Sequence, residues 1–99
     1  MKIYISGPIT GHPRERVERA FAEAEAVIRE SGHEPVNPLG NGLPISATWY
    51  EHMRADIRML LDCDAILMIG DWPCSRGVSI EMELAIGLGM NVYIDKIEE

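Results

Sequence analysis

The feature that most constrains the fold is the alternation of short strand-like runs with longer amphipathic segments. Three segments repeat apolar residues at helical spacing. They predict helices that begin near Pro13, at Thr48 and at about Gly77 and end near Gly32, Leu61 and Leu88. Thr48 and Glu51 fit a capping box at the start of the second helix. The runs around these segments predict four strands, over residues 2–6, 34–37, 64–69 and 91–94.

This order of elements predicts a parallel sheet with right-handed crossovers and helices on both faces. We expect an α/β, flavodoxin- or Rossmann-like three-layer sandwich of about four strands in the order 2-1-3-4. In that order the chain direction reverses between the first and third strands. A ligand is therefore expected beyond the carboxyl ends of these two strands, between the loops at residues 6–11 and 70–77.

Length and charge restrict the classes of function. The 99 residues predict one domain over residues 1–99, with a core small enough that a partner subunit would help to stabilise it. The net charge of −7 argues against a nucleic-acid or membrane surface, and the apolar run 65–69 is too short to span a bilayer. Cys63 and Cys74 form no CxxC pair, and the histidines show no metal-ligand spacing. We expect free thiols, no metal and a cytoplasmic location.

Asp56 breaks the apolar pattern of the second predicted helix. At about 100° per residue, Trp49, Met53 and Leu60 cluster within a narrow arc, and Asp56 falls in the middle of it. A buried charge costs several kcal/mol unless it is paired or hydrogen-bonded. A functional carboxylate is one explanation. An exposed helix end, or shielding of the charge by Arg54 or Arg58, is the other.

Glu81 and Glu83 differ in their position on the third predicted helix. Glu81 lies about 60° from Val78, at the edge of the face expected to pack on the sheet, whereas Glu83 points nearly opposite. Glu81 is also just over one turn from the helix start and so close to the predicted crevice. The simpler explanation is an acidic side chain that interacts favourably with the helix dipole.

The loops at the crevice contain further candidates. Ser75 suits an N-cap, and the amides near Gly77 suit either helix capping or a phosphate. The loop Ser6–Gly11 lacks a P-loop pattern, so it is interpreted as a segment that lets a ligand approach the backbone. Trp72 is a candidate stacking platform or lid. Tyr4 has a hydroxyl that needs a partner if it is buried, and Trp49 is expected in the core.

Several of these segments together resemble the nucleoside 2-deoxyribosyltransferase superfamily. The likeness spans nearly the whole chain and is greatest to a short, often phage-encoded branch of uncharacterised function (DUF4406-like). It also extends to the 2′-deoxynucleoside 5′-phosphate N-hydrolases, in which an arginine replaces Thr10. The matching segments are Tyr4-Ile5-Ser6-Gly7-Pro8-Ile9-Thr10-Gly11, Asn37-Pro38, Asp64-Ala65-Ile66, a Trp, and Ser75-Arg76-Gly77-Val78 followed by Glu81.

The resemblance implies cleavage of the N-glycosidic bond of a 2′-deoxynucleoside or its 5′-monophosphate, by hydrolysis or by transfer to another base. By position, Glu81 falls on the nucleophile, Asp56 on the catalytic aspartate and Tyr4 on the tyrosine that contacts the nucleophile. Asp56 is either the proton donor to the base or a group that orients the sugar. No cofactor is implied. Expected substrate-binding residues are Ser6, Gly7, Ile9, Gly11, Trp72, Ser75 and Gly77.

Two further expectations follow. The alternative function is a catalytically silent nucleotide-binding or host-interaction protein on the same fold. Homodimers or higher homo-oligomers are also expected, because Ile80, Leu84 and Leu88 recur at i, i+4 and i+8 on the third helix, away from its sheet-facing side. Within one chain, the loop at residues 38–47 is the other segment that could cover this stripe.

Overall fold

A computed structural model of the chain describes residues 1–97. Seven regular elements alternate along the chain, with two 3-10 turns, η1 (Pro38–Gly40) and η2 (Trp72–Cys74), between them. No helix in this part of the chain is both long and apolar enough to cross a membrane. The elements are β1 (Lys2–Ser6), α1 (Arg14–Glu30), β2 (Glu34–Val36), α2 (Trp49–Leu61), β3 (Ala65–Met68), α3 (Arg76–Gly87) and β4 (Asn91–Ile94).

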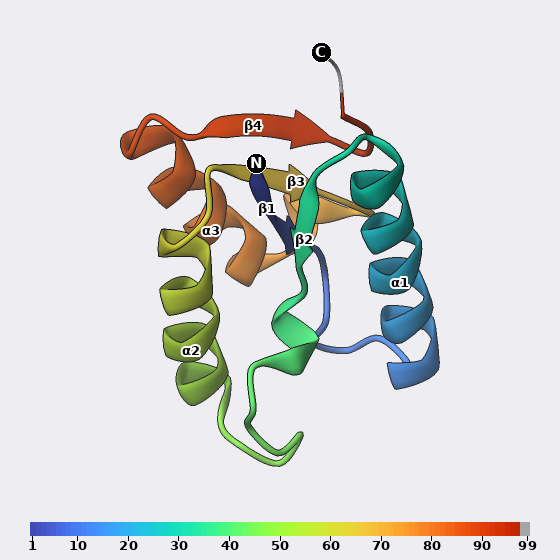
Figure 1. The fold of residues 1–99 in the computed structure, drawn as a ribbon. Coiled ribbons are helices and arrows are strands. Elements are labelled where there is room, and N and C mark those ends of the chain that lie inside the picture. The colour runs from blue at the N-terminus through green and yellow to red at the C-terminus, as the bar shows by residue number, and fades with distance from the viewer. Residues whose placement is uncertain (98–99) are drawn as a thin grey trace.

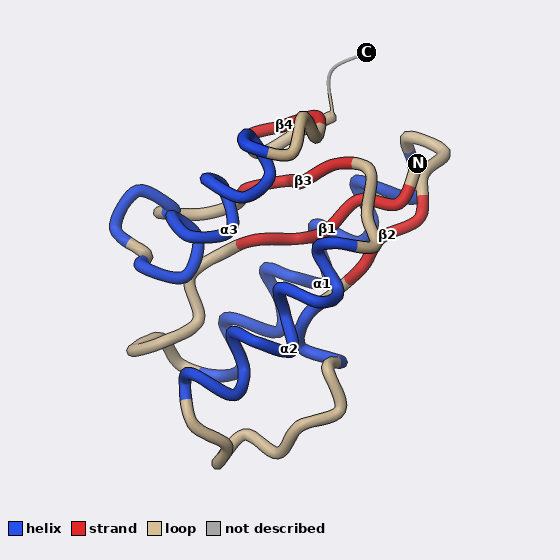
Figure 2. Tube along the Cα trace, turned by 90° about the vertical axis from the view of Figure 1, so that its left-hand side faces the viewer, coloured by secondary structure: helices blue, strands red, loops and turns tan. Residues whose placement is uncertain are grey.

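The four strands form one parallel sheet in the order β2-β1-β3-β4. Both the fold class and the strand order predicted from the sequence are therefore confirmed. Helix α1 covers one face of the sheet, and α2 and α3 cover the other (Figure 1). Turned by 90°, the molecule shows the strands in succession from β4 to β2 (Figure 2). The loop between η1 and α2 extends away from the sheet in both views.

The alternation of side chains on β1 divides the core in two. Ile3 and Ile5 pack with buried residues of α1, whereas Tyr4 joins a second cluster with residues of α2 and α3. Ser6 is fully buried and bonds to a residue of α3, so it shares the face of Tyr4. Full burial of an aliphatic side chain contributes about 1.5–3 kcal/mol. Each face of the sheet thus has its own apolar core, and the face toward α2 and α3 also carries the polar side chains of Tyr4 and Ser6.

Local sequence signals set the helix ends. Thr48 accepts a hydrogen bond from the backbone N–H of Glu51, and the Glu51 carboxylate accepts one from the Thr48 N–H. This is the predicted capping box. Ser75 caps α3 by accepting from the Val78 N–H at 3.3 Å. Gly32, just beyond α1, has a φ of 83°, which glycine adopts without strain. The two caps define the residues at which α2 and α3 begin.

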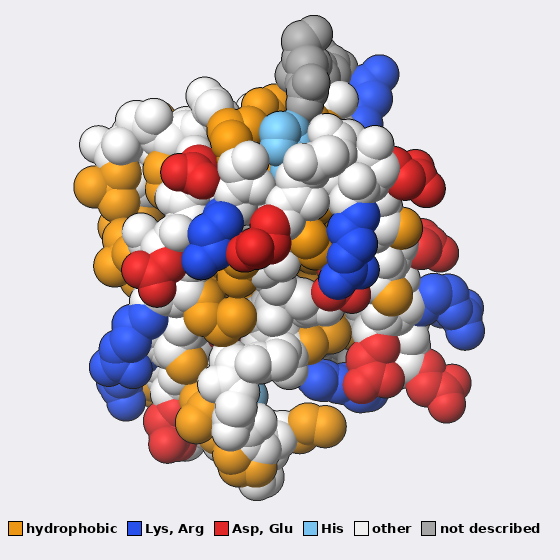
Figure 3. Space-filling model, in the orientation of Figure 1, with side chains coloured by type: hydrophobic (Ala, Val, Ile, Leu, Met, Phe, Trp, Pro, Cys, Tyr) orange, Lys and Arg blue, Asp and Glu red, His pale blue; other side chains and the backbone are white. Residues whose placement is uncertain are grey.

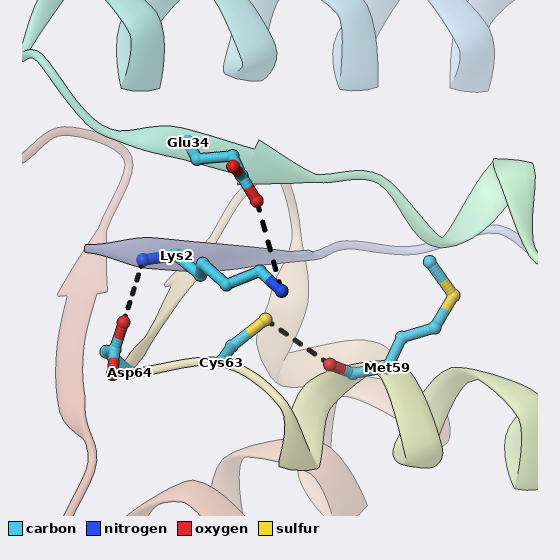
Figure 4. Close-up of polar contacts among 5 residues, drawn as sticks. All are labelled: Lys2, Glu34, Met59, Cys63 and Asp64. Carbon is cyan, nitrogen blue, oxygen red and sulfur yellow. Dashed lines mark hydrogen bonds and ion pairs between the residues drawn. The ribbon is translucent and has the colours of Figure 1, made fainter.

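At the amino-terminal ends of the strands, polar contacts join β1 to its neighbours (Figure 4). The backbone N–H of Lys2 donates to Asp64 at 2.8 Å, and the Lys2 ammonium lies 4.0 Å from the Glu34 carboxylate. The Cys63 thiol donates to the Met59 carbonyl, and burial raises its pKa to about 11. Exposed ion pairs of this kind contribute at most about 1 kcal/mol. These contacts connect the start of β1 to β2 and to the residue that precedes β3.

Candidate active site

A cavity of about 630 Å³ opens at the carboxyl ends of β1 and β3. The loop after β1, the segment around η2, the inner face of α2 and the loop after η1 all line it. The strand order reverses between β1 and β3, and this is the position at which ligands bind in sheets of this type. Of the catalytic and substrate-binding residues expected from the sequence, those that line the cavity are Tyr4, Gly7, Ile9, Asp56, Ser75, Gly77 and Glu81.

Glu81 is a buried carboxyl group held by two hydroxyls of β1. Its side chain is 5% exposed. The Tyr4 hydroxyl donates to Oε2 at 2.5 Å, and the Ser6 hydroxyl donates to Oε1 at 2.6 Å. Tyr4 and Ser6 are two residues apart on one strand, so both side chains emerge on the same face. The two bonds fix the plane of the carboxyl group at the base of the cavity, whereas the neighbouring Glu83 is exposed.

The environment of Glu81 shifts its proton affinity. Burial raises its pKa from the ordinary value of 4.5 to about 7, even though the hydrogen bonds from Ser6 and Tyr4 favour the ionised form. The negative charge of Asp56 raises the pKa further. Burial, followed by the charge of Glu81, also raises the pKa of Tyr4 well above its usual range, so Tyr4 remains a donor. Near neutral pH, Glu81 is thus present in both its ionised and its protonated form.

Asp56 lies in the same cavity and is 6% exposed. The amide of Asn41 donates to its Oδ1 at 2.8 Å and contacts His52 Nδ1 at 3.0 Å. Burial raises the pKa of Asp56, and the hydrogen bond from Asn41 opposes that shift. The carboxylate on the apolar arc of α2 is therefore buried, as its position in the helix indicated, and neither Arg54 nor Arg58 forms an ion pair with it within residues 1–97.

Three expected binding residues are not in the cavity wall. Ser6 lies beneath it and bonds to Glu81, and Gly11 is outside the set of lining residues. Trp72 packs partly against the second core cluster instead. Gly7 does line the cavity, and a Cβ there would lie 2.7 Å from Ile69 Cγ1. Close packing therefore explains that glycine without any ligand.

Other cavity residues were not found from the sequence. The Arg76 guanidinium lies 4.3 Å from the ring centroid of Trp49, a cation–π contact at the cavity wall. Trp49 therefore lies half-buried in the wall rather than in the core. His52 is four residues before Asp56 on α2, and this spacing could have placed it on the same helix face. Asn41 follows η1 in an aperiodic loop, where the sequence carries no such signal.

The grouping of His, Cys, Asp and Glu side chains determines whether a metal ion could be bound. Within residues 1–97, no group of three or more His, Cys, Asp or Glu side chains is placed to hold a metal ion. The two carboxyl groups of the cavity instead accept hydrogen bonds from neutral hydroxyl and amide donors. This geometry offers two carboxyl groups in one cavity, a combination suited to nucleophilic attack by one and proton exchange by the other.

The sequence profile of the family described as "Domain of unknown function (DUF4406)" matches residues 1–94. The chain belongs to this family. The comparison with curated protein sequences finds no match.

Among solved structures, a 2-deoxyribosyltransferase from Bacillus psychrosaccharolyticus is similar with a TM-score of 0.72 and 24% identity, over 100% of this chain and 77% of that one. The deoxyribosyltransferase from Leishmania mexicana is similar with a TM-score of 0.71 and 24% identity, over 98% of this chain and 65% of that one. The CMP N-glycosidase from Clostridium botulinum is similar with a TM-score of 0.64 and 16% identity, over 95% of this chain and 70% of that one. The chain thus has the fold of these enzymes and spans about two-thirds to three-quarters of their length.

Proposed function

We propose that the protein cleaves the N-glycosidic bond of a 2′-deoxynucleoside or its 5′-monophosphate through a glycosyl-enzyme intermediate. Glu81 is the nucleophile, Asp56 is the proton donor to the leaving base, and Tyr4 and Ser6 position Glu81. The observation that carries the proposal is the buried Glu81 carboxyl group, whose two oxygens each accept one hydroxyl hydrogen bond at the base of the cavity. The shared fold with deoxyribosyltransferases and an N-glycosidase supports it.

The reaction proceeds in two displacements at C1′ of the sugar. An oxygen of ionised Glu81 forms a bond to C1′ while the C1′–N bond breaks. The electron pair of the C1′–N bond leaves with the base, and the base takes the proton of Asp56. Water or a second base then attacks C1′ and releases Glu81, and Asp56 takes the proton that the attacking group gives up. A pKa of about 7 suits Glu81 to both roles, because it must attack as an anion and later depart as one.

The cavity wall supplies groups for the rest of the substrate. Ser75, Arg76 and Gly77 at the amino-terminal end of α3 are suited to a 5′-phosphate, since free helix amides and a cation attract anions. Leu43 and Ile45 line the mouth of the cavity, and Ile45 is 71% exposed. Hydrophobic side chains are visible on this loop at the bottom of Figure 3. We infer that they contact the base.

A release assay tests the proposal. The protein is incubated with a panel of deoxynucleosides and their 5′-monophosphates, with and without an acceptor base, and free base and new nucleoside are separated by chromatography. We expect release by the wild type, the same rate with Glu83→Gln, and no release with Glu81→Gln. Glu83 lies on the same helix but is exposed, so it controls for the loss of one carboxylate. Equal loss in both variants would contradict the assignment of the nucleophile.

The same panel separates catalysis from silent binding. A nucleotide that binds in a calorimeter and stays intact through a long incubation would favour the catalytically silent alternative. Release of base without formation of a new nucleoside identifies hydrolysis, and formation of a new nucleoside identifies transfer.

We also propose that the chain forms a homodimer. Of the predicted stripe on α3, Ile80 and Leu84 are half-buried, and Leu84 packs against the core. Leu88 is 58% exposed, and Ile94 on the edge strand β4 is 49% exposed. The loop after η1 lines the cavity and leaves Leu88 exposed, so it does not cover the stripe on α3.

A second copy that packs on α3 and β4 would bury both side chains. Sedimentation of the wild type at micromolar concentration is expected to give twice the chain mass of 11.1 kDa. The Leu88→Glu variant is expected to sediment with the mass of a single chain. A wild-type monomer with full turnover would refute the dimer.

A further inference from the structure

The amide of Asn41 uses all its hydrogen-bonding groups at the cavity. Its Oδ1 accepts from the backbone N–H of Leu43 at 2.9 Å, and its Nδ2 lies 2.8 Å from Asp56 Oδ1 and 3.0 Å from His52 Nδ1. A backbone N–H can only donate, so it fixes which end of the amide is the oxygen. The two N–H groups of Nδ2 therefore point to Asp56 and His52.

This arrangement determines which ring nitrogen of His52 carries the proton. Since Asn41 donates to Nδ1, that nitrogen accepts, and the ring proton sits on Nε2. Nε2 lies 3.1 Å from the Pro44 carbonyl and donates to it. His52 is thus a neutral imidazole that bridges the loop after η1 and helix α2. Asn41 and Pro44, three residues apart in that loop, are both tied to one helix turn that ends at Asp56.

The same arrangement distinguishes the two oxygens of Asp56. Oδ1 receives the Asn41 N–H, so a proton on Oδ1 would face another donor. In the acid form, the proton therefore sits on Oδ2. No group within residues 1–97 donates to Oδ2, and no buried side-chain oxygen in that part of the chain lacks a partner. Oδ2 is accordingly the oxygen that is open to the cavity that Asp56 lines.

We propose that Asn41 and His52 are positioning residues that hold the acidic proton of Asp56 on Oδ2, directed at the leaving base. The inference rests on the proposed function, in which Asp56 is the proton donor. Asn41 turns the carboxyl group, and His52 holds Asn41 by accepting its second N–H. The Pro44 carbonyl is the last member of this series of hydrogen bonds and holds the imidazole of His52 in place. A general acid is effective only when its proton lies within hydrogen-bond reach of the atom that receives it.

Loss of Asn41 should change kcat in opposite directions through the protonation of Asp56 and through its orientation. Its hydrogen bond favours ionised Asp56, so Asn41→Ala should raise the pKa of Asp56 and increase the fraction of the acid form. A change of protonation alone would then leave the rate equal or higher. Loss of orientation lowers kcat. A fall in kcat together with a rise in the pKa of Asp56 is thus a signature that general damage to the fold does not produce.

The first experiment compares Asn41→Ala with Asn91→Ala, which removes an amide from the exposed edge strand. The Asp56 carboxyl carbon is followed by NMR from about pH 3 to 9 in each protein, and kcat and KM are measured on the substrate found in the release assay. For Asn41→Ala we expect a higher pKa of Asp56, a fall in kcat of about 10- to 100-fold and little change in KM. Asn91→Ala should match the wild type.

The second experiment separates the two hydrogen bonds of His52. His52→Asn keeps an acceptor at the position of Nδ1 and loses the donor to Pro44, whereas His52→Gln keeps a donor near the position of Nε2 and loses the acceptor. If His52 acts through Asn41, His52→Asn retains more of kcat than His52→Gln. The reverse order would show that anchoring of the loop, rather than orientation of Asp56, is the role of His52, and would overturn the proposal.

The NMR titration keeps this inference separable from the proposed function. If no substrate releases base, the catalytic assignment fails, yet the wild-type spectrum still shows whether His52 carries its proton on Nε2, and the titration still shows whether Asn41 lowers the pKa of Asp56. An Asp56 titration that is the same in Asn41→Ala and wild type would refute the positioning role even in an active enzyme.

Discussion

Replacement of Glu81 by glutamine should make the folded protein more stable above neutral pH and catalytically inactive. The change preserves the size of the side chain and one carbonyl oxygen, and it removes only the ionisable group. The Tyr4 and Ser6 hydroxyls can each rotate to donate or accept, so both retain a hydrogen bond to the amide. The variant therefore isolates the free energy that is associated with a charge at this buried position.

The raised pKa of Glu81 determines the size and sign of the effect. Between pH 4.5 and about 7, the folded chain keeps a proton that the unfolded chain has lost. The stabilisation from this proton is complete below about pH 4.5 and is lost as the pH rises to about 7. At about 1.4 kcal/mol for each tenfold difference in proton affinity, the loss amounts to about 3 kcal/mol. Domains are typically stable by only about 5–15 kcal/mol.

Urea unfolding followed by circular dichroism, at about pH 4.5 and about pH 8, measures this term. We expect the wild type and Glu83→Gln to lose about 3 kcal/mol more than Glu81→Gln between the two pH values. In the release assay, Glu81→Gln should fall by roughly four orders of magnitude or more, as for other covalent nucleophiles. Parallel stability curves for Glu81→Gln and wild type would refute the argument from burial, and undiminished turnover would refute the nucleophile.

The remaining predictions concern Tyr4 and Asp56. Tyr4→Phe removes a donor that favours the ionised form, so the rise of kcat/KM with pH should move to higher pH, while Tyr93→Phe on β4 leaves the profile unchanged. A profile that is unaltered in Tyr4→Phe would show that the hydroxyl has no part in setting the pKa of Glu81. Asp56→Asn should reduce turnover by at least about 100-fold, with melting temperature unchanged or raised, because it removes a buried charge and keeps an acceptor for Asn41. Matching losses of turnover and melting temperature, absent in the exposed Asp62→Asn, would make Asp56 structural.

The fold follows closely from local patterns in the sequence. The strand Lys2–Ser6 and the capping box at Thr48 were predicted as the structure has them, because each depends on residues within one short segment. The second and third strands are shorter than expected, at Glu34–Val36 and Ala65–Met68. The turns η1 and η2 were not predicted as 3-10 helices, since each contains a proline and lies in a loop without periodicity. Regular hydrogen bonding is encoded locally, and irregular turns are not.

The buried carboxyl groups of the candidate site could be found from the sequence because each departs from the pattern of its own helix. Asp56 and Glu81 lie on or beside apolar arcs, and both are buried in the structure. The groups that accommodate them come from elsewhere in the chain. Ser6 is 75 residues from Glu81, and Asn41 is 15 residues from Asp56. No periodicity connects such pairs, because tertiary packing alone brings them together.

The choice of partners for the two carboxyl groups is itself informative. A buried carboxylate with a structural role is usually paired with a cation, which lowers its pKa and keeps it ionised. Within residues 1–97, the ion pairs do not include Glu81 or Asp56, and their hydrogen bonds come from neutral hydroxyl and amide groups. Neutral donors satisfy the oxygens without compensating the charge, so burial dominates and both pKa values stay raised. Under the proposed function this cost has a reason, because nucleophilic attack and proton transfer near neutral pH require carboxyl groups with raised pKa values.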